Sequence, residues 1–240
     1  MLCFLQAPIE NILLSKIRNK PITNIAILAN HWKLLSDNTK EKLKKSDYTL
    51  FLDNMIFEGN PISVEDYISI INEMKPDYFV LPDSFGDIKE TFNLHTIYWD
   101  KINDDLKPGA VAVVNDPMIP KDYELWIKKN VKLIGVPYFG NRSRMYTLEL
   151  VTMAFLDHSI HLLGMSTLSS YIKYSYLSSV FNIFSSDSSL VYTSTKAGCD
   201  FTYGVYKKDT ISSDLIYDPD LDMNLFQKNI EWLASREWEL

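Results

Sequence analysis

The sequence predicts an α/β protein, and most specifically a small single-domain (β/α)8 barrel of the TIM type. Short apolar runs alternate with longer amphipathic segments, which indicates repeated strand–helix units. Roughly seven or eight such units in 240 residues are close to the minimum for this barrel. A doubly wound open sheet shows the same alternation and is the alternative. However, neither glycine-rich nucleotide-binding motif of that sheet follows a predicted strand.

Several apolar runs are β-branched and hydrophobic at every position, as parallel strands covered by helices should be. In chain order the predicted strands are 24–29, 48–52, 78–81, 110–114, 131–136, 160–163 and 180–184. The predicted helices between and after them are 63–74, 89–106, 121–129, 143–156, 167–177 and 224–238. Ser63 precedes Asp66 by three residues, which is the spacing of a capping box at a helix start.

The composition is that of an ordinary globular protein, with 46% hydrophobic and 23% charged residues. No Pro/Gly/Ser linker divides the chain, so we expect residues 1–240 to form one domain. No apolar run approaches the ~20 residues that span a bilayer, and no basic segment of a signal peptide opens the chain. The two cysteines, Cys3 and Cys199, exclude a disulfide framework and a thiolate-rich zinc site. We therefore expect a cytoplasmic protein with no membrane partner.

Four predicted strands are followed within a few residues by an aspartate. In parallel α/β folds catalytic groups gather just beyond the carboxyl ends of the strands. The four aspartates are Asp53, Asp83, Asp116 and Asp187. Any one of them could cap a helix or close a turn, which is how we interpret Asp116 and also Asp87. Four aspartates on one rim favour a catalytic role over a capping role, but they do not identify the reaction.

A pair of carboxylates in one pocket suits glycosyl transfer, because one can attack an anomeric carbon while the other moves protons. Carboxylates can also hold a metal together with histidines, and His31 and His161 are the candidates. No H-x-H or H-E-x-x-H motif supports that interpretation, and a histidine inside the run 160–163 is more typical of a core. We therefore favour chemistry without a metal or other cofactor.

Five segments occur in an order that resembles a known family. They are FLDNMIFE at 51–58, KPDYFVLPD at 75–83, IGVPYFG at 134–140, IHLLG at 160–164 and FSSDS at 184–188. Together they resemble the tRNA-guanine transglycosylases, and most closely their phage and bacterial relatives that insert 7-deazaguanines into DNA. The resemblance covers about residues 24–204.

This resemblance implies a role for each matching residue. Asp187 would be the nucleophile that attacks C1′ of a guanine nucleotide, and Asp53 would be the general acid/base. Asp83 would accept hydrogen bonds from the Watson–Crick edge of the base, where two donors match two carboxylate oxygens. Phe57 would stack on the base. The other residues implied in substrate binding are Asn54, Gly135, Pro137, Tyr138 and Gly164.

The sequence also departs from the family. Met55 and Ile56 replace small residues, and Tyr138 stands where a glutamine is often found. The C-x-C-x-x-C…H zinc site of the tRNA enzymes is missing, which favours DNA over tRNA as the partner. The incoming base would be a 7-deazaguanine such as preQ0, and the site of action the host cytoplasm if a phage encodes the protein. A homo-oligomer and an accessory DNA-processing protein are both compatible with this function.

The net charge of −7 disfavours a broadly basic surface but allows a local basic groove. The candidate phosphate contacts are Lys121, Lys128, Lys129, Arg142, Arg144 and Lys173, each of which could equally belong to a solvated face.

Two other functions remain open. One is a metal-dependent hydrolase that uses His31, Asp53, His161 and Asp187. The other is a degenerate barrel that binds a base, a nucleic acid or a partner protein without turnover. The substitutions at Met55, Ile56 and Tyr138 motivate this last alternative.

Overall fold

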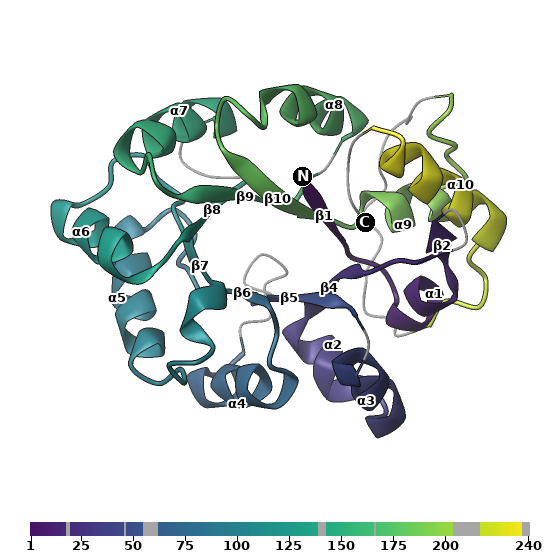
Figure 1. The fold of residues 1–240 in the computed structure, drawn as a ribbon, viewed down its shortest axis with the longest axis horizontal. Coiled ribbons are helices and arrows are strands. Elements are labelled where there is room, and N and C mark those ends of the chain that lie inside the picture. The colour runs from purple at the N-terminus through teal and green to yellow at the C-terminus, as the bar shows by residue number, and fades with distance from the viewer. Residues whose placement is uncertain are drawn as a thin grey trace.

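A closed barrel of eight parallel strands forms the centre of the molecule, and its helices lie outside the ring (Figure 1). The computed structural model describes residues 1–17, 20–45, 47–54, 62–138, 143–165, 167–203 and 217–236. The strand nearest the N-terminus closes the barrel. It pairs on one side with the last strand, at residues 183–188, and on the other side with the second barrel strand, at residues 24–28. The predicted (β/α)8 barrel is therefore confirmed, and the open doubly wound sheet is excluded.

The barrel strands follow one another around the ring in the order β1-β10-β9-β8-β7-β6-β5-β4. Their bounds are β1 Leu2–Leu5, β4 Asn24–Leu28, β5 Thr49–Asp53, β6 Tyr78–Val80, β7 Ala110–Val113, β8 Leu133–Pro137, β9 Ser159–Leu163 and β10 Ile183–Ser188. A separate antiparallel pair, β2 Lys16–Ile17 and β3 Lys20–Pro21, precedes β4. Six of the seven predicted strands coincide closely with these elements.

The seventh predicted strand, 180–184, was placed too early. Val180 is exposed, and Asn182 adopts a positive φ of 50° in the turn that precedes β10. The strand begins at Ile183 and continues through the polar run that ends at Ser188. Strand β1 was not predicted, because four residues are too few to show a hydrophobic period.

The helices are α1 Ile9–Leu14, α2 Ala29–Leu34, α3 Asp37–Lys45, α4 Val64–Met74, α5 Ile88–Trp99, α6 Lys121–Asn130, α7 Arg144–Ala154, α8 Leu168–Leu177, α9 Leu190–Lys196 and α10 Met223–Ala234. A 3-10 turn spans Lys107–Gly109. None of the helices in the described ranges is both long enough and apolar enough to cross a membrane.

Helix starts follow the capping residues. Ser63 accepts a hydrogen bond from the backbone N–H of Asp66 at 3.1 Å, as its spacing predicts. Asp87 caps α5 by accepting from the N–H groups of Lys89 and Glu90, which confirms its predicted role. The predicted helix 89–106 is too long, because α5 ends at Trp99 and turns occupy the chain before the 3-10 turn.

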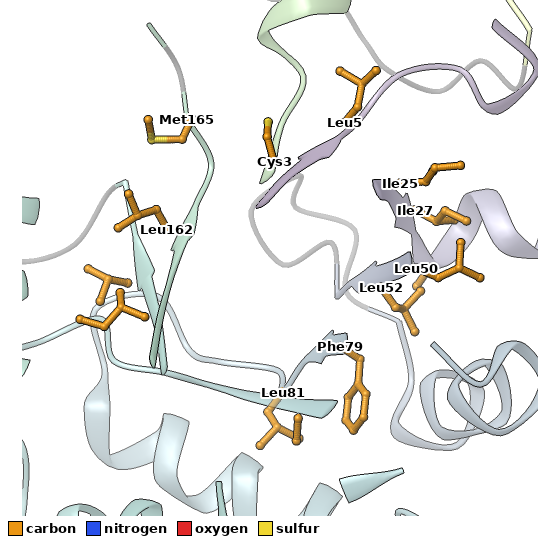
Figure 2. Packing of buried hydrophobic residues seen from close by; sticks show 14 of the residues in the cluster. Cys3, Leu5, Ile25, Ile27, Leu50, Leu52, Phe79, Leu81, Leu162 and Met165 are labelled. Atoms are coloured by element: carbon orange, nitrogen blue, oxygen red, sulfur yellow. The ribbon is translucent and has the colours of Figure 1, made fainter. Parts of the chain in front are cut away.

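The barrel has two apolar layers because successive side chains of a strand point to opposite faces. The outer layer packs strands against helices, and Figure 2 shows Ile25, Ile27, Leu50 and Leu52 pointing away from the ring. A second cluster fills the inside of the barrel. We call it the inner cluster, and it consists of Phe4, Ala26, Phe51, Val80, Val111, Val113 and Leu133.

The C-terminal part of the chain is tied to the N-terminal part by buried polar contacts. The Asn11 side chain exchanges hydrogen bonds with the backbone of Asp218, at 2.8 and 3.0 Å. The Asp218 carboxylate pairs with Lys196 at 2.9 Å and accepts from the Tyr192 hydroxyl at 3.0 Å. Burial would raise the pKa of Asp218, but the hydrogen bonds from Lys196 and Tyr192 outweigh it and hold this pKa below its usual value. This network joins α1, α9 and the segment before α10.

Candidate functional site

The carboxyl ends of the strands form one rim of the barrel, where polar side chains replace the inner cluster. Phe51 belongs to the inner cluster, and Asp53 follows it two residues later on the same face of β5. On β1 and β10 the inner residue Phe4 lies opposite Asp187. Asp53 and Asp187 therefore both face the barrel interior near its carboxyl end.

Asp187 is nearly fully buried, with 4% of its surface exposed. Its Oδ1 lies 3.0 Å from His161 Nε2 and accepts a hydrogen bond from the backbone N–H of Gly164 at 3.1 Å. It lies inside β10 and does not cap the following helix. Ser189 is the N-cap of α9, and Ser188 Oγ accepts from the N–H of Leu190 at 2.9 Å. The capping interpretation of Asp187 is therefore wrong.

His161 forms the floor beneath Asp187. Its ring is fully buried, and Nδ1 lies 2.8 Å from the Ser185 hydroxyl. The imidazole stacks on the Phe51 ring, with 4.3 Å between ring centroids and 16° between ring planes. Because β9 and β5 lie on opposite sides of the barrel, this stack spans the interior. It connects the strand that carries Asp53 to the residue that holds Asp187.

Asp83 belongs to a second polar group on the neighbouring strand ends. Asn115 Nδ2 donates to Asp83 Oδ2 at 3.3 Å and to the Ser84 carbonyl at 2.7 Å. Burial raises the pKa of Asp83 to about 6, against the opposing effect of hydrogen bonds from Asn115 and Asn54. Asn54, which directly follows Asp53, also donates to the Leu81 carbonyl at 3.3 Å. The side chains of Asn54, after β5, and Asn115, after β7, thus fix the Asp83 carboxyl, which follows β6.

Gly164 and Arg144 shape the rim beside Asp187. Gly164 has a φ of +65°, a conformation that glycine adopts without strain, and its N–H points to the carboxylate. The buried Arg144 guanidinium donates to the carbonyls of Pro137, at 3.2 Å, and of Gly164, at 3.1 Å, and also to that of Leu163. Arg144 therefore joins the ends of β8 and β9.

The remaining predicted base contacts lie in different surroundings. Tyr138 is exposed at the rim, with its ring 5.1 Å from the Arg144 guanidinium carbon. Gly135 lies inside β8, and a side chain there would meet Leu163 at 3.0 Å and Val111 at 3.1 Å. Gly135 therefore makes room for barrel packing, below the rim. Phe57, Met55 and Ile56 lie outside the described residues, as does Gly140.

Among the described residues, the predicted phosphate contacts lie in different parts of the barrel. Arg144 is buried, so its proposed contact with phosphate is wrong. Lys128 and Lys129 lie in the last turn of α6, at the end of the barrel opposite the rim, and not near it as predicted. Lys121 begins α6 near the rim, and Lys173 lies within α8. Arg142 is outside the described residues.

The metal-site alternative finds no support in the described ranges, because they hold no group of three or more His, Cys, Asp or Glu side chains suited to a metal ion. His31, expected in the loop after the first predicted strand, lies instead in α2, since β4 ends at Leu28 and the helix starts at Ala29. Asp116 accepts from the N–H of Met118 at 2.8 Å, as expected of a turn residue.

The residues that hold the carboxylates were not predicted in that role. Asn115 follows a strand just as the aspartates do, so its position could have identified it. Ser185 and the pairing of His161 with Asp187 carry no such signal, because they depend on the register between β9 and β10. No protein-family model matches the sequence, and no curated protein matches it.

Proposed function

We propose that this protein is a transglycosylase that exchanges guanine in DNA for a 7-deazaguanine base such as preQ0. The observation that carries the proposal is the placement of Asp187 and Asp53 on the inner face of one rim, above a shared floor of His161 stacked on Phe51. Two carboxylates that face a common space are what a double displacement at an anomeric carbon requires. The choice of base and of DNA rests on the sequence resemblance.

The exchange takes two steps. An oxygen of Asp187 attacks C1′ of the target nucleotide, and a C1′–O ester bond forms as the bond from C1′ to the base nitrogen breaks. The electron pair goes to the departing guanine, which takes a proton from Asp53. In the return step Asp53 removes the proton from the incoming base, whose nitrogen attacks C1′ and releases the Asp187 carboxylate. Such an exchange needs neither ATP nor a redox cofactor.

Asp83 is proposed to recognise the base. Its ionised carboxylate offers two acceptors to the N1–H and exocyclic amine of a guanine-like edge. The hydrogen bond from Asn115 holds this carboxylate in one orientation. A target base in duplex DNA must leave the stack before it can reach the site.

Base exchange can be tested directly. Purified protein is incubated with guanine-containing DNA or with tRNA, each with labelled preQ0 or guanine, and label in the polymer is measured. We expect incorporation into DNA, and its loss by at least about 10³-fold in Asp187→Asn and Asp53→Asn. Asp116→Asn is the matched control, because Asp116 is a rim aspartate that closes a turn.

Each other outcome has a definite meaning. Incorporation into tRNA alone would keep the chemistry and overturn the choice of polymer. Binding of the base without incorporation into single-stranded or duplex DNA would contradict the transglycosylase proposal and favour a barrel that binds without turnover.

A further inference from the structure

We propose that His161 is a positioning residue that holds one oxygen of the Asp187 carboxylate and thereby directs the other oxygen at C1′. This inference rests on the proposed function. The contacts that carry it form a chain inside the barrel, from the Ser185 hydroxyl to His161 Nδ1 at 2.8 Å and from Nε2 to Asp187 Oδ1 at 3.0 Å.

The direction of these hydrogen bonds follows from the Asp187 carboxylate, which is the acceptor at the end of the series. An ionised carboxylate can only accept hydrogen bonds, so Nε2 must carry a proton. In neutral imidazole Nδ1 then has no proton, and the Ser185 hydroxyl donates to it. Asp187 therefore selects the tautomer that donates to the carboxylate, and the Ser185 hydroxyl, which can donate or accept, is compatible with it.

The surroundings of His161 fix its ring. The side chain is fully buried, stacked on Phe51, and 6.2 Å from the Phe4 ring between centroids. An apolar side chain would fill this part of the inner cluster without the cost of burying polar groups. The imidazole is therefore better explained by its contact with Asp187 than by packing, and the buried Ser185 hydroxyl by its contact with the imidazole.

The second donor to Asp187 comes from the backbone. Gly164 N–H donates to the same oxygen, Oδ1, as His161 does. Within the described part of the chain no hydrogen bond reaches Oδ2, which leaves that oxygen to form the ester bond. When the incoming base displaces the ester, the electron pair returns to the carboxylate, and both donors stabilise the returning charge. Loss of His161 should therefore lower kcat more than it raises KM.

Kinetics of three variants test this role. His161→Phe keeps the stacking ring and removes both hydrogen bonds, and we expect kcat to fall by about 10²-fold or more with little change in KM. His161→Gln retains an N–H donor and should recover part of the loss. His158→Phe is the matched control, because it removes another buried histidine just before β9, at the end of the barrel away from the rim. Equal kcat values for His161→Phe and His158→Phe would overturn the proposal.

A second measurement does not depend on activity or on the stability of a variant. Nitrogen-15 NMR of the histidine ring in the wild-type protein shows which nitrogen of His161 carries a proton. We expect a protonated Nε2 whose resonance moves in Asp187→Asn but not in Asp116→Asn. A bare Nε2 would overturn the proposal, since it cannot donate to the carboxylate. An inactive wild type with a protonated Nε2 would instead reject the proposed function, and the positioning role with it, while leaving the contact established.

Discussion

Individual side chains decide what the rim can do, and Asp83 shows how burial and hydrogen bonding compete at one of them. Burial raises its pKa to about 6, while Asn115 and Asn54 oppose the shift. The carboxyl is therefore poised between the form that accepts two hydrogen bonds and the form that has gained a proton.

We expect base binding to depend on pH through Asp83. As pH falls through about 6, the carboxylate gains a proton and loses an acceptor, so KM for the incoming base should rise. Asp83→Asn should raise KM at pH 8 and remove this dependence. Steady-state kinetics from pH 5 to pH 8 in both proteins checks the prediction, and a KM that does not change over this range in the wild type would contradict it.

The same group should affect stability in the opposite sense. The folded-state pKa of Asp83 lies above its usual value of 3.8, so the folded state binds the extra proton between about pH 4 and pH 6, and the free energy of unfolding falls as pH rises through that window. Above pH 6 the cost of the buried charge is present in full. On the proposed function, a carboxyl that recognises the base thus destabilises the fold at the pH at which it acts.

At the scale of elements, helix α7 is joined to two strand ends by its first residue. Arg144 donates to the carbonyls of Pro137 and Gly164, and the backbone N–H of Gly164 donates to Asp187 Oδ1. Burial lowers the pKa of Arg144 to about 10, so the guanidinium remains charged at neutral pH.

We expect Arg144→Met to lower the free energy of unfolding by about 2 kcal/mol, because methionine leaves buried strand-end carbonyls without donors. The variant should also lower kcat, since the backbone at Gly164 is no longer held. Arg236→Met, which removes an exposed arginine from the Trp232 ring, is the control and should change neither quantity measurably. Urea unfolding with parallel kinetics separates the two effects. Unchanged kcat in a destabilised Arg144→Met would show that Arg144 serves only the fold.

The elements that could be predicted are those whose sequence shows a period or a cap. Strands β4 to β9 are apolar on both faces, and α4 begins at a serine with the expected spacing. Strand β10 was misplaced because its polar second half is buried by its neighbours and not by its own hydrophobicity. The aspartates could be assigned to a rim from strand ends alone. Their partners could not, because the contact of His161 with Asp187 joins residues 26 apart in sequence through the strand register.

At the scale of the whole molecule, the contacts of Asp218 with Asn11, Tyr192 and Lys196 join the C-terminal part of the chain to its N-terminal part. We expect Asp218→Asn to lower the free energy of unfolding by about 2–3 kcal/mol at pH 7, because it leaves Lys196 unpaired beside a buried site. Asp200→Asn, which breaks a more exposed pair with Lys228, should cost clearly less. Urea unfolding of both variants checks the difference.

The pH dependence gives an independent test of the same pair. A depressed pKa means that Asp218 contributes stability above its unfolded-state pKa, and that this contribution is lost as pH falls through the folded-state pKa. The wild type should therefore lose its advantage over Asp218→Asn in acid. An advantage that persists at pH 2 would show that the ion pair is not its source.

Strand β1 is synthesised first, but it pairs mainly with β10, the barrel strand that is synthesised last. Four residues of β1 align with β10, but only Leu5 aligns with β4. The main partner of β1 is therefore synthesised about 180 residues after β1 itself. At ~5–20 residues per second this delay is ~10–40 s. During that interval the edge of β1 that later pairs with β10 has no strand beside it. The nascent barrel should consequently depend on chaperones or on slow elongation until residue 188 has emerged, and truncation before that point should yield aggregation-prone chains rather than a smaller folded unit.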